Sequence, residues 1–434
     1  MKIEKYSIGV GDRFGFEGSA QLRALQQAEK QGVRIVPVWN KSNREHTIIG
    51  TSPEDARREA DKAVQTCGWN ASYYVDADHI SIGTVDKFIN SSNFFTIDIA
   101  DHIGKPAAGY SVSAFLKEMD RFRGTLHIPG IDNTFVITSD IPMKIAKKYL
   151  FSIEEAGRVY RYIADKKGID NFVTEISLDE TNLPQSPVEL FFILAAIARE
   201  KIPIQTIAPK FTGAFLKGVD YVGDISKFTS EFEEDLAVLA YAIKTFNLPG
   251  NLKLSIHSGS DKFSLYPIIH KSLNKFNAGL HLKTAGTTWL EEIIGLASCG
   301  GKGLILAKDI YQEAFKRYNE MSQPYLTVID IDKNMLPSPE EVMSWSDIEY
   351  VQALQHNQSC KKFNRHFRQF IHIGYKVAAE MGENYLRLLQ EYRSSIELNV
   401  TTNIYERHIQ PLFFGQDKHS SKSTVREKEN IQET

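Results

Sequence analysis

Short apolar runs that suit β-strands alternate with longer amphipathic segments through the first two thirds of this 434-residue chain. A connection between parallel strands needs a dozen or more residues, usually as a helix, so the alternation predicts a parallel sheet with helical crossovers. Eight such units would close a TIM-like (β/α)8 barrel. The expected strands lie within residues 6–12, 34–39, 72–80, 94–101, 171–180, 202–211, 252–259 and 279–286.

Three departures from this alternation divide the chain. The connection of residues 102–170 is too long for one crossover, and its segment GTLHIPGIDNTFVIT indicates an inserted hairpin or lid. Residues 331–414 change to long amphipathic helices, which we expect to pack as a layer on an α/β barrel domain formed by residues 1–330. Residues 415–434 are polar, mixed in charge and almost free of large apolar side chains, so a disordered tail is expected there.

The composition excludes several classes of protein. With 42% hydrophobic and 24% charged residues the chain is an ordinary globular protein, and its net charge of −3 gives no basic field for nucleic acid. It contains no run of about 18 apolar residues for a membrane span, and its first residues lack the apolar core of a signal peptide. Cys67, Cys299 and Cys360 are odd in number and far apart, which favours a cytoplasmic protein without a disulfide framework. Homo-oligomerisation is left open.

Several expected strands carry apolar residues on one face and polar residues on the other. Successive residues of a strand point to opposite faces, so Glu175 shares a face with Val173 and Ser177, and Asp98 shares one with Thr96. The same alternation places His257 opposite the apolar face of its strand, and places His281 and Lys283 together. Barrel bores are usually filled by branched apolar residues, so these polar faces indicate a site at the carboxyl ends of the strands.

Two histidines and a carboxylate at strand ends are a credible set of metal ligands. Glu175, His257 and His281 would suit Zn²⁺, Mn²⁺, Ni²⁺ or Fe²⁺ with positions left open for substrate oxygens, and Asp98 is a fourth ligand or an acid/base. A single histidine is more simply explained as a hydrogen-bonded interior residue. Two at matching strand ends beside Glu175 favour a divalent metal cation, and His79 is a further candidate.

Cationic residues at the same strand ends form a second constellation. Arg13 follows the first strand, Lys210 follows the sixth and Lys283 ends the eighth, so we expect these three to bind a carboxylate or to polarise oxygens of an anionic substrate. Ser258 belongs to a Ser-Gly-Ser turn that suits a backbone anion site. No Walker loop or G-x-G-x-x-G fingerprint is present, which disfavours a nucleotide.

Six segments in the same order resemble the tagaturonate/fructuronate epimerase family: GVGDRFG, EISLDE, APKFTGAFLKGVDYVGD, KLSIHSGSDKF, HLKTAGTTWLEE and NIYERHIQPLF. The resemblance runs from about residue 6 to residue 414. It implies a cytoplasmic isomerase of hexuronate catabolism that needs a divalent metal, and its relatives include tagatose 4-epimerases. We expect a second cation after FTG in this family, but the chain has Ala214, so a ketouronate and a neutral ketohexose both remain candidate substrates.

Such an epimerase must invert a hydroxyl-bearing carbon that is β to a ketone and whose C–H is not acidified by it. Retro-aldol cleavage and re-addition, assisted by the metal, is the favoured route, with Asp179 or Glu180 moving the hydroxyl proton. Deprotonation activated from the other end of the substrate is the alternative mechanism. Two other functions stay open: a metal-dependent class II-like ketose aldolase, suggested by SIHSGS, and a non-catalytic sugar-acid binding protein.

Overall fold

The computed structural model describes residues 1–181 and 183–415, and within them eight parallel strands close into a barrel in the order β1-β10-β9-β8-β7-β4-β3-β2. Their bounds are β1 Tyr6–Val10, β2 Val36–Ser42, β3 Tyr74–Ile80, β4 Phe94–Asp98, β7 Val173–Ser177, β8 Thr206–Ala208, β9 Lys253–His257 and β10 Leu280–Lys283. Each strand overlaps one of the eight expected runs, so the predicted TIM-like (β/α)8 barrel is confirmed.

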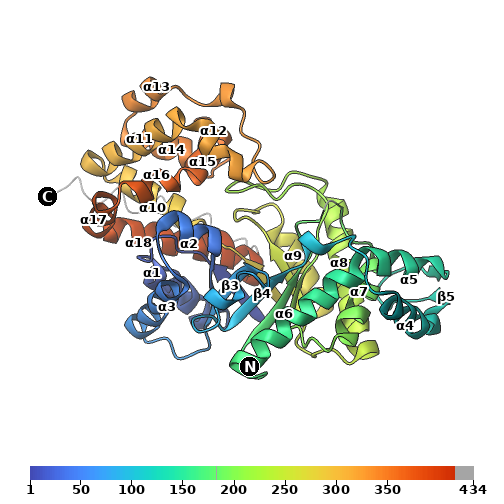
Figure 1. Ribbon diagram of the computed structural model, residues 1–434. Coiled ribbons are helices and arrows are strands. Elements are labelled where there is room, and N and C mark those ends of the chain that lie inside the picture. The colour runs from blue at the N-terminus through green and yellow to red at the C-terminus, as the bar shows by residue number, and fades with distance from the viewer. Residues whose placement is uncertain (182, 416–434) are drawn as a thin grey trace.

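Helices cover the outside of the barrel. They are α1 Gly18–Lys30, α2 Asn43–Ile49, α3 Pro53–Cys67, α6 Phe151–Lys167, α7 Pro187–Arg199, α8 Ile225–Phe246 and α9 Tyr266–Phe276. In Figure 1, α1 and α3 lie on one side of the strands and α6, α7 and α8 on the other. Helix α7 shows why the chain turns helical here: Ser186 Oγ accepts from the Glu189 N–H at 3.3 Å, and Glu189 accepts from the Ser186 N–H at 3.0 Å. This capping box satisfies donors that a helix start otherwise leaves free.

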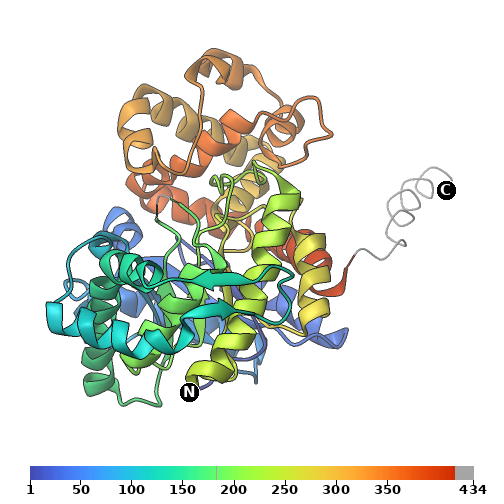
Figure 2. The same cartoon turned by 90° about the vertical axis from the view of Figure 1, so that its right-hand side faces the viewer.

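The connection between β4 and β7 contains the expected hairpin. It comprises α4 Gly109–Met119, β5 Gly124–Leu126, β6 Phe135–Ile137 and α5 Asp140–Ile145, and β5 pairs antiparallel with β6. Figures 1 and 2 place the hairpin at the periphery of the barrel, away from the helices that follow β10. It therefore decorates the barrel wall and does not cover the site described below.

The described chain beyond β10 is helical up to Phe414. The elements are α10 Thr288–Ser298, α11 Gly301–Lys316, α12 Tyr318–Ser322, α13 Pro339–Ser344, α14 Asp347–Leu354, α15 Arg365–Ile373, α16 Tyr375–Glu380, α17 Glu383–Glu391, α18 Arg393–Thr402 and the π-helix η7 Asn403–Phe414. In Figure 1, α11–α16 form a layer beyond one end of the barrel. Helix η7 contacts both α9 and α1, so it completes the outer ring of helices. The division at residues 330 and 331 stays a prediction, and the tail of residues 416–434 lies outside the described residues.

The bore of the barrel is apolar at one end and polar at the other. Ile3, Val36, Val38, Tyr74, Phe94 and Val173 form a buried cluster separate from the main core. The next inward-facing positions on β3, β4 and β7 are Asp76, Thr96 and Glu175, because side chains alternate along a strand. The polar part of the bore therefore begins one layer above this apolar cluster, which we call the plug.

In the described part of the chain, no helix combines the length and the hydrophobicity needed to cross a bilayer.

Candidate active site

Four charged side chains meet in the polar part of the bore. Lys283 Nζ lies 3.0 Å from Asp76 Oδ2, 2.8 Å from Asp78 Oδ1 and 3.4 Å from Glu175 Oε1. Thr96 Oγ1 donates to Asp76 Oδ1 at 3.0 Å and accepts from the Lys283 ammonium. The side chains of Asp76, Glu175 and Lys283 are at most 3% exposed. One buried cation therefore serves three carboxylates.

The pKa values in this group follow from burial and charge. Burial alone would lower the pKa of Lys283, but Asp76, Asp78 and Glu175 raise it above its ordinary value. Burial would raise the pKa of Glu175, but Lys283 and His257 hold it well below its ordinary value. At Asp76 burial prevails and raises the pKa to about 6. The sequence predicts Lys283 as a substrate-binding residue, whereas the structure engages its ammonium with protein carboxylates.

His257 links this buried layer to the mouth of the barrel. Its Nε2 lies 2.9 Å from Glu175 Oε1, and its Nδ1 lies 3.1 Å from Asp179 Oδ2. Burial would lower the pKa of His257, but Asp179 and the bond to Glu175 raise it to about 10. Nδ1 makes no well-aligned hydrogen bond within the described residues. A carboxylate that holds the far nitrogen of a histidine is the usual outer partner of a metal-binding imidazole.

His79 reaches the same mouth because β3 contains a bulge. The pairing of β3 with β4 shifts register between Ala77 and Ile80, and His79 has a left-handed φ of 51°. In a regular strand His79 would point toward the outer helices, since Asp78 points into the bore; a bulge re-aims such a side chain. The His79 ring centroid lies 5.2 Å from that of His257, and its Nδ1 lies 3.4 Å from Asp98 Oδ2.

Two groups of side chains at the mouth have ligand atoms within 4.8 Å of one another. The first is His79, Asp179 and His257, and the second is His79, Asp98 and Glu180. About a quarter of the side-chain surface of His79, Asp98 and Asp179 is exposed, at 24%, 24% and 25%. Two imidazoles with a carboxylate, partly open to solvent, are donors that Zn²⁺ and similar divalent metals accept while keeping positions for a substrate.

The carboxylates around His79 differ in their protonation. Burial would raise the pKa of Asp179, but His257 lowers it below its ordinary value. The pKa of Asp98 is lowered as well, because the bond to His79 outweighs burial. At Glu180 burial prevails and the pKa is raised. Asp179 is therefore suited to hold a cation, and Glu180 to carry a proton.

His281 lies deeper in the barrel than His257. The strand register pairs His257 with Lys283 and places His281 beside Ser255, one inward layer toward the plug. His281 Nδ1 lies 3.0 Å from Ser7 Oγ, and its ring is 5.3 Å from that of Phe94. Burial lowers its pKa to about 3, so the imidazole is neutral. Neither His281 nor Glu175 belongs to the two ligand groups found among the described residues.

The other three residues that the sequence predicts for the site, Arg13, Ser258 and Lys210, lie in different surroundings. Arg13 pairs with Glu45 at 3.3 Å, and its guanidinium lies 4.4 Å from the ring centroid of Tyr375 in the helical layer. Ser258 Oγ donates to the Thr284 carbonyl at 2.9 Å, which fixes the turn after β9. The backbone N–H of Lys210 donates to Gln185 Oε1 at 2.9 Å. The Lys210 ammonium forms no ion pair with a carboxylate of the described residues.

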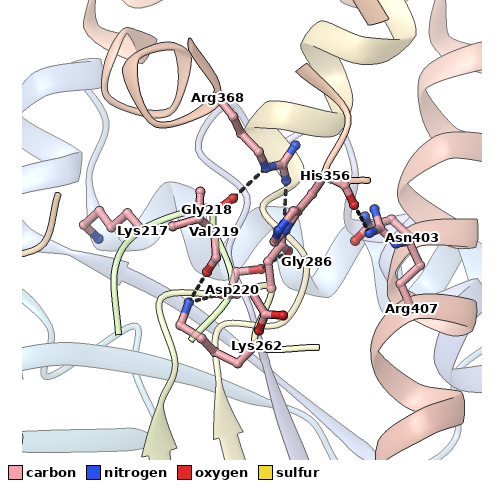
Figure 3. A network of polar contacts seen from close by, with 12 residues as sticks. Lys217, Gly218, Val219, Asp220, Lys262, Gly286, His356, Arg368, Asn403 and Arg407 are labelled. Carbon is pink, nitrogen blue, oxygen red and sulfur yellow. Dashed lines mark hydrogen bonds and ion pairs between the residues drawn. The ribbon is translucent and has the colours of Figure 1, made fainter. Parts of the chain in front are cut away.

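A second buried network, which sequence analysis did not predict, joins the loop after β9 to the helical layer (Figure 3). Asp261 Oδ2 accepts from Arg368 Nη2 at 2.6 Å and lies 3.0 Å from His356 Nδ1. Arg368 Nε donates to the Gly218 carbonyl at 2.6 Å, and Lys262 donates to the Val219 carbonyl at 2.7 Å. The only sequence signal was an unusual density of polar residues in SGSDK. The network ties the segment after His257 to helices remote in sequence.

Comparisons with known proteins agree with this architecture. A family model described as tagaturonate epimerase matches residues 1–412, which confirms the resemblance seen in the sequence motifs. The tagaturonate/fructuronate epimerase of Thermotoga maritima is 28% identical over 352 residues, which cover 77% of this chain and 68% of that protein. Crystal structures of the fructuronate-tagaturonate epimerase of Cohnella laeviribosi, native and with glycerol, share this fold with a TM-score of 0.75 at 24% identity, over 95% of this chain and 82% of theirs. The chain therefore belongs to the tagaturonate epimerase family and is an epimerase.

Proposed function

We propose that this epimerase interconverts D-tagaturonate and D-fructuronate with the help of a divalent metal ion. The observation that carries the proposal is the convergence of His79, Asp179 and His257 at the carboxyl ends of three barrel strands. The family model and the Thermotoga maritima relative are named for these ketouronates. The neutral ketohexoses D-tagatose and D-fructose are the second substrate pair to be tested.

His79, Asp179 and His257 would hold the cation, which we expect to be Zn²⁺, Mn²⁺, Ni²⁺ or Fe²⁺. Glu175 orients His257 from behind through the 2.9 Å contact with Nε2. Asp98 likewise orients His79 through the 3.4 Å contact between Asp98 Oδ2 and His79 Nδ1. A divalent cation held by these residues would supply Lewis acidity toward a ketone and a neighbouring hydroxyl and would offset negative charge that develops on their oxygens.

Retro-aldol cleavage is the proposed route of inversion. The hydroxyl on the β carbon gives up its proton, the bond between the α and β carbons breaks, and its electron pair forms an enediolate on the ketone half. The β carbon becomes an aldehyde, which rotates and is attacked again on its other face. Glu180 is the proposed acid/base because burial raises its pKa, whereas the pKa values of Asp98 and Asp179 are lowered, so Glu180 is the carboxylate that accepts a proton most readily. Lys210, after β8, is proposed to polarise a substrate oxygen.

Nuclear magnetic resonance of D-tagaturonate and D-tagatose, incubated with metal-free and then metal-reloaded enzyme, tests this function. We expect D-fructuronate to appear only after reloading. In heavy water the inverted carbon should keep its hydrogen, because retro-aldol cleavage never breaks that C–H bond. Deuterium at that carbon would indicate deprotonation, free cleavage products would indicate an aldolase, and turnover by fully metal-free enzyme would contradict the metal requirement.

We also propose that the enzyme works in the cytoplasm. Cys67, Cys299 and Cys360 are all free thiols, and Cys299 is exposed. Free and accessible thiols are typical of a reducing compartment.

A further inference from the structure

Three cationic side chains from separate segments gather around two tyrosines of the helical layer. Arg44 belongs to α2 and Lys217 to the loop between β8 and α8, and their charged groups lie 5.1 Å and 5.9 Å from the ring centroid of Tyr325. Arg13 lies 4.4 Å from the ring of Tyr375. The two tyrosine hydroxyls are 2.7 Å apart and hydrogen-bonded, so the three cations share one scaffold. We call Arg13, Arg44 and Lys217 the cationic cluster.

The cationic cluster has more positive charge than its protein partners neutralise. Glu45 pairs with Arg13 at 3.3 Å. Within residues 1–181 and 183–415, neither Arg44 nor Lys217 has a carboxylate oxygen within 4.0 Å, although surface lysines and arginines of this chain commonly do. Figure 3 shows the Lys217 side chain directed away from Asp220 and Lys262, toward the other side of its loop. Two of the three cations therefore lack a counter-ion in the described structure.

Buried polar atoms without a hydrogen-bond partner lie in and next to the cationic cluster. Arg13 Nε is buried and has no hydrogen-bond partner among the described residues, and the same holds for both ring nitrogens of His372. His372 is buried close to the Lys217 loop, since a Cβ on Gly218 would lie 3.4 Å from His372 Nδ1. Buried polar groups are normally satisfied, so three unpaired nitrogen atoms this close together favour a polar ligand nearby.

The cationic cluster also adjoins the proposed metal site. Ser42, the last residue of β2, pairs with Asp78 of β3, and Arg44 follows two residues later. Asp78 is the residue that precedes His79, and its Oδ1 lies 3.7 Å from His79 Nε2. Arg13 lies three residues beyond the end of β1, and Lys217 belongs to the loop that follows β8. The cationic cluster and the two ligand groups therefore lie at the same end of the barrel, beyond the carboxyl ends of its strands.

We propose that Arg13, Arg44 and Lys217 form the subsite for the substrate's carboxylate, and that Lys217 and Arg44 make the enzyme select a hexuronate over a neutral ketohexose. This inference rests on the proposed function. It also bears on the choice between a ketouronate and a neutral ketohexose, which Ala214 leaves open. The positive charge absent at position 214 is supplied by Lys217, three residues later in the same loop, and by Arg44. Arg and Lys are the side chains suited to clamp a carboxylate.

The loop that carries Lys217 is held from both sides, which fixes the position of its backbone. The Lys217 N–H donates to the Val328 carbonyl at 2.9 Å, and the Gly218 N–H donates to the Gly259 carbonyl at 3.1 Å. Arg368 binds the Gly218 carbonyl from the helical layer. A loop that is already ordered loses less freedom when the substrate binds, so a cation that it carries contributes more to selection.

The test compares kcat/KM for D-tagaturonate and for D-tagatose in Lys217→Met, Arg44→Met and the wild type, all loaded with metal. We expect each variant to lose about 10- to 100-fold on the uronate, the usual effect of removing one charge-assisted hydrogen bond. Turnover of D-tagatose should stay within about twofold or rise. Lys217→Arg, which keeps the charge, should retain most uronate activity. Lys227→Met, which removes an exposed charge from α8, is the matched control.

Metal content and the thermal midpoint of each variant show that the fold and the metal site are intact. Equal losses on both substrates, or an unchanged kcat/KM for the uronate, would overturn the subsite. A wild type that converts no D-tagaturonate under any divalent metal would instead overturn the proposed function. A wild type that converts the uronate while Lys217→Met does so equally well would overturn this inference alone.

Discussion

Lys283 determines how three carboxylates coexist inside one barrel. Asp76 and Glu175 are fully buried, and moving an isolated carboxylate out of water costs several kcal/mol. The ammonium between them offsets much of that cost but leaves an excess of negative charge below the mouth. His257 lies above this layer, and its pKa is raised chiefly by Asp179 and also by its hydrogen bond to Glu175. A divalent cation above this layer would be stabilised for the same reason.

Replacing Lys283 with Met should therefore destabilise the fold strongly. We expect the free energy of unfolding, measured in urea, to fall by about 3–5 kcal/mol, because the variant leaves buried carboxylates without their counter-ion. Lys316→Met is the matched control, since Lys316 is 62% exposed and pairs with Glu313 on the surface. That variant should change stability by less than about 1 kcal/mol. Similar losses in both variants would contradict the role given to Lys283.

Sequence alone could identify His257 and His281 as inward-facing but could not give their depth. Both end apolar runs, and both follow the same alternation of faces. Depth depends on the stagger of neighbouring strands, which the register of β9 against β10 sets and no local pattern encodes. The pattern thus predicted which face is polar, whereas the contact of His281 with Ser7 required the closed barrel.

Regular elements of this chain were predictable, and the irregular ones carry much of the site. All eight strands follow from apolar runs between amphipathic helices. The bulge that turns His79 inward depends on the pairing of β3 with β4, and period-two alternation assigns that residue to the wrong face. Likewise Gly259, Ser260 and Asp261 are all left-handed, a conformation that long-range partners such as Arg368 maintain.

The loop after β9 should loosen when its anchor is removed. In Asp261→Asn, Arg368 loses its buried counter-charge, and we expect faster hydrogen exchange at the amides of residues 216–220 and 258–262. The two segments are joined by the Gly218–Gly259 hydrogen bond, so they should respond together. Asp330→Asn is the control, because Asp330 is 42% exposed and pairs with Arg365 on the surface. Unchanged exchange in both segments would show that the helical layer does not hold this loop.

At the scale of the whole molecule, buried acidic groups lie near the junction of the barrel with the helices that follow β10, where α1 contacts α18. Glu17, the residue before α1, is fully buried with both carboxylate oxygens unpartnered among the described residues. Burial and the neighbouring Asp12 raise its pKa to about 8. Burial likewise raises the pKa of Glu292 in α10 well above its ordinary value, and Glu292 accepts from Tyr385 of α17 at 2.7 Å. The junction of the two parts is therefore most stable when these acids carry protons.

Stability should consequently fall as pH rises from about 5 to 8. A carboxyl whose pKa is raised in the fold, here from 4.5 to about 8, binds a proton that the unfolded chain releases. Its contribution is complete below pH 4.5 and is lost as pH rises through 8. Glu17→Gln should reduce the slope of the unfolding free energy in this window by up to about 1.4 kcal/mol per pH unit. Glu383→Gln, an exposed change, should leave the slope unaltered, and equal slopes in wild type and Glu17→Gln would refute the assignment.

The most direct measurement of the central claim is the metal content of a matched pair, His79→Ala and His281→Ala, after stripping and reloading with Zn²⁺ or Mn²⁺. Both histidines lie in the barrel, but the His79 side chain belongs to the ligand groups at the mouth and His281 to the layer near the plug. We expect His79→Ala to lose the metal and His281→Ala to retain about one ion per chain. Retention in His79→Ala together with loss in His281→Ala would place the cation elsewhere and contradict this claim.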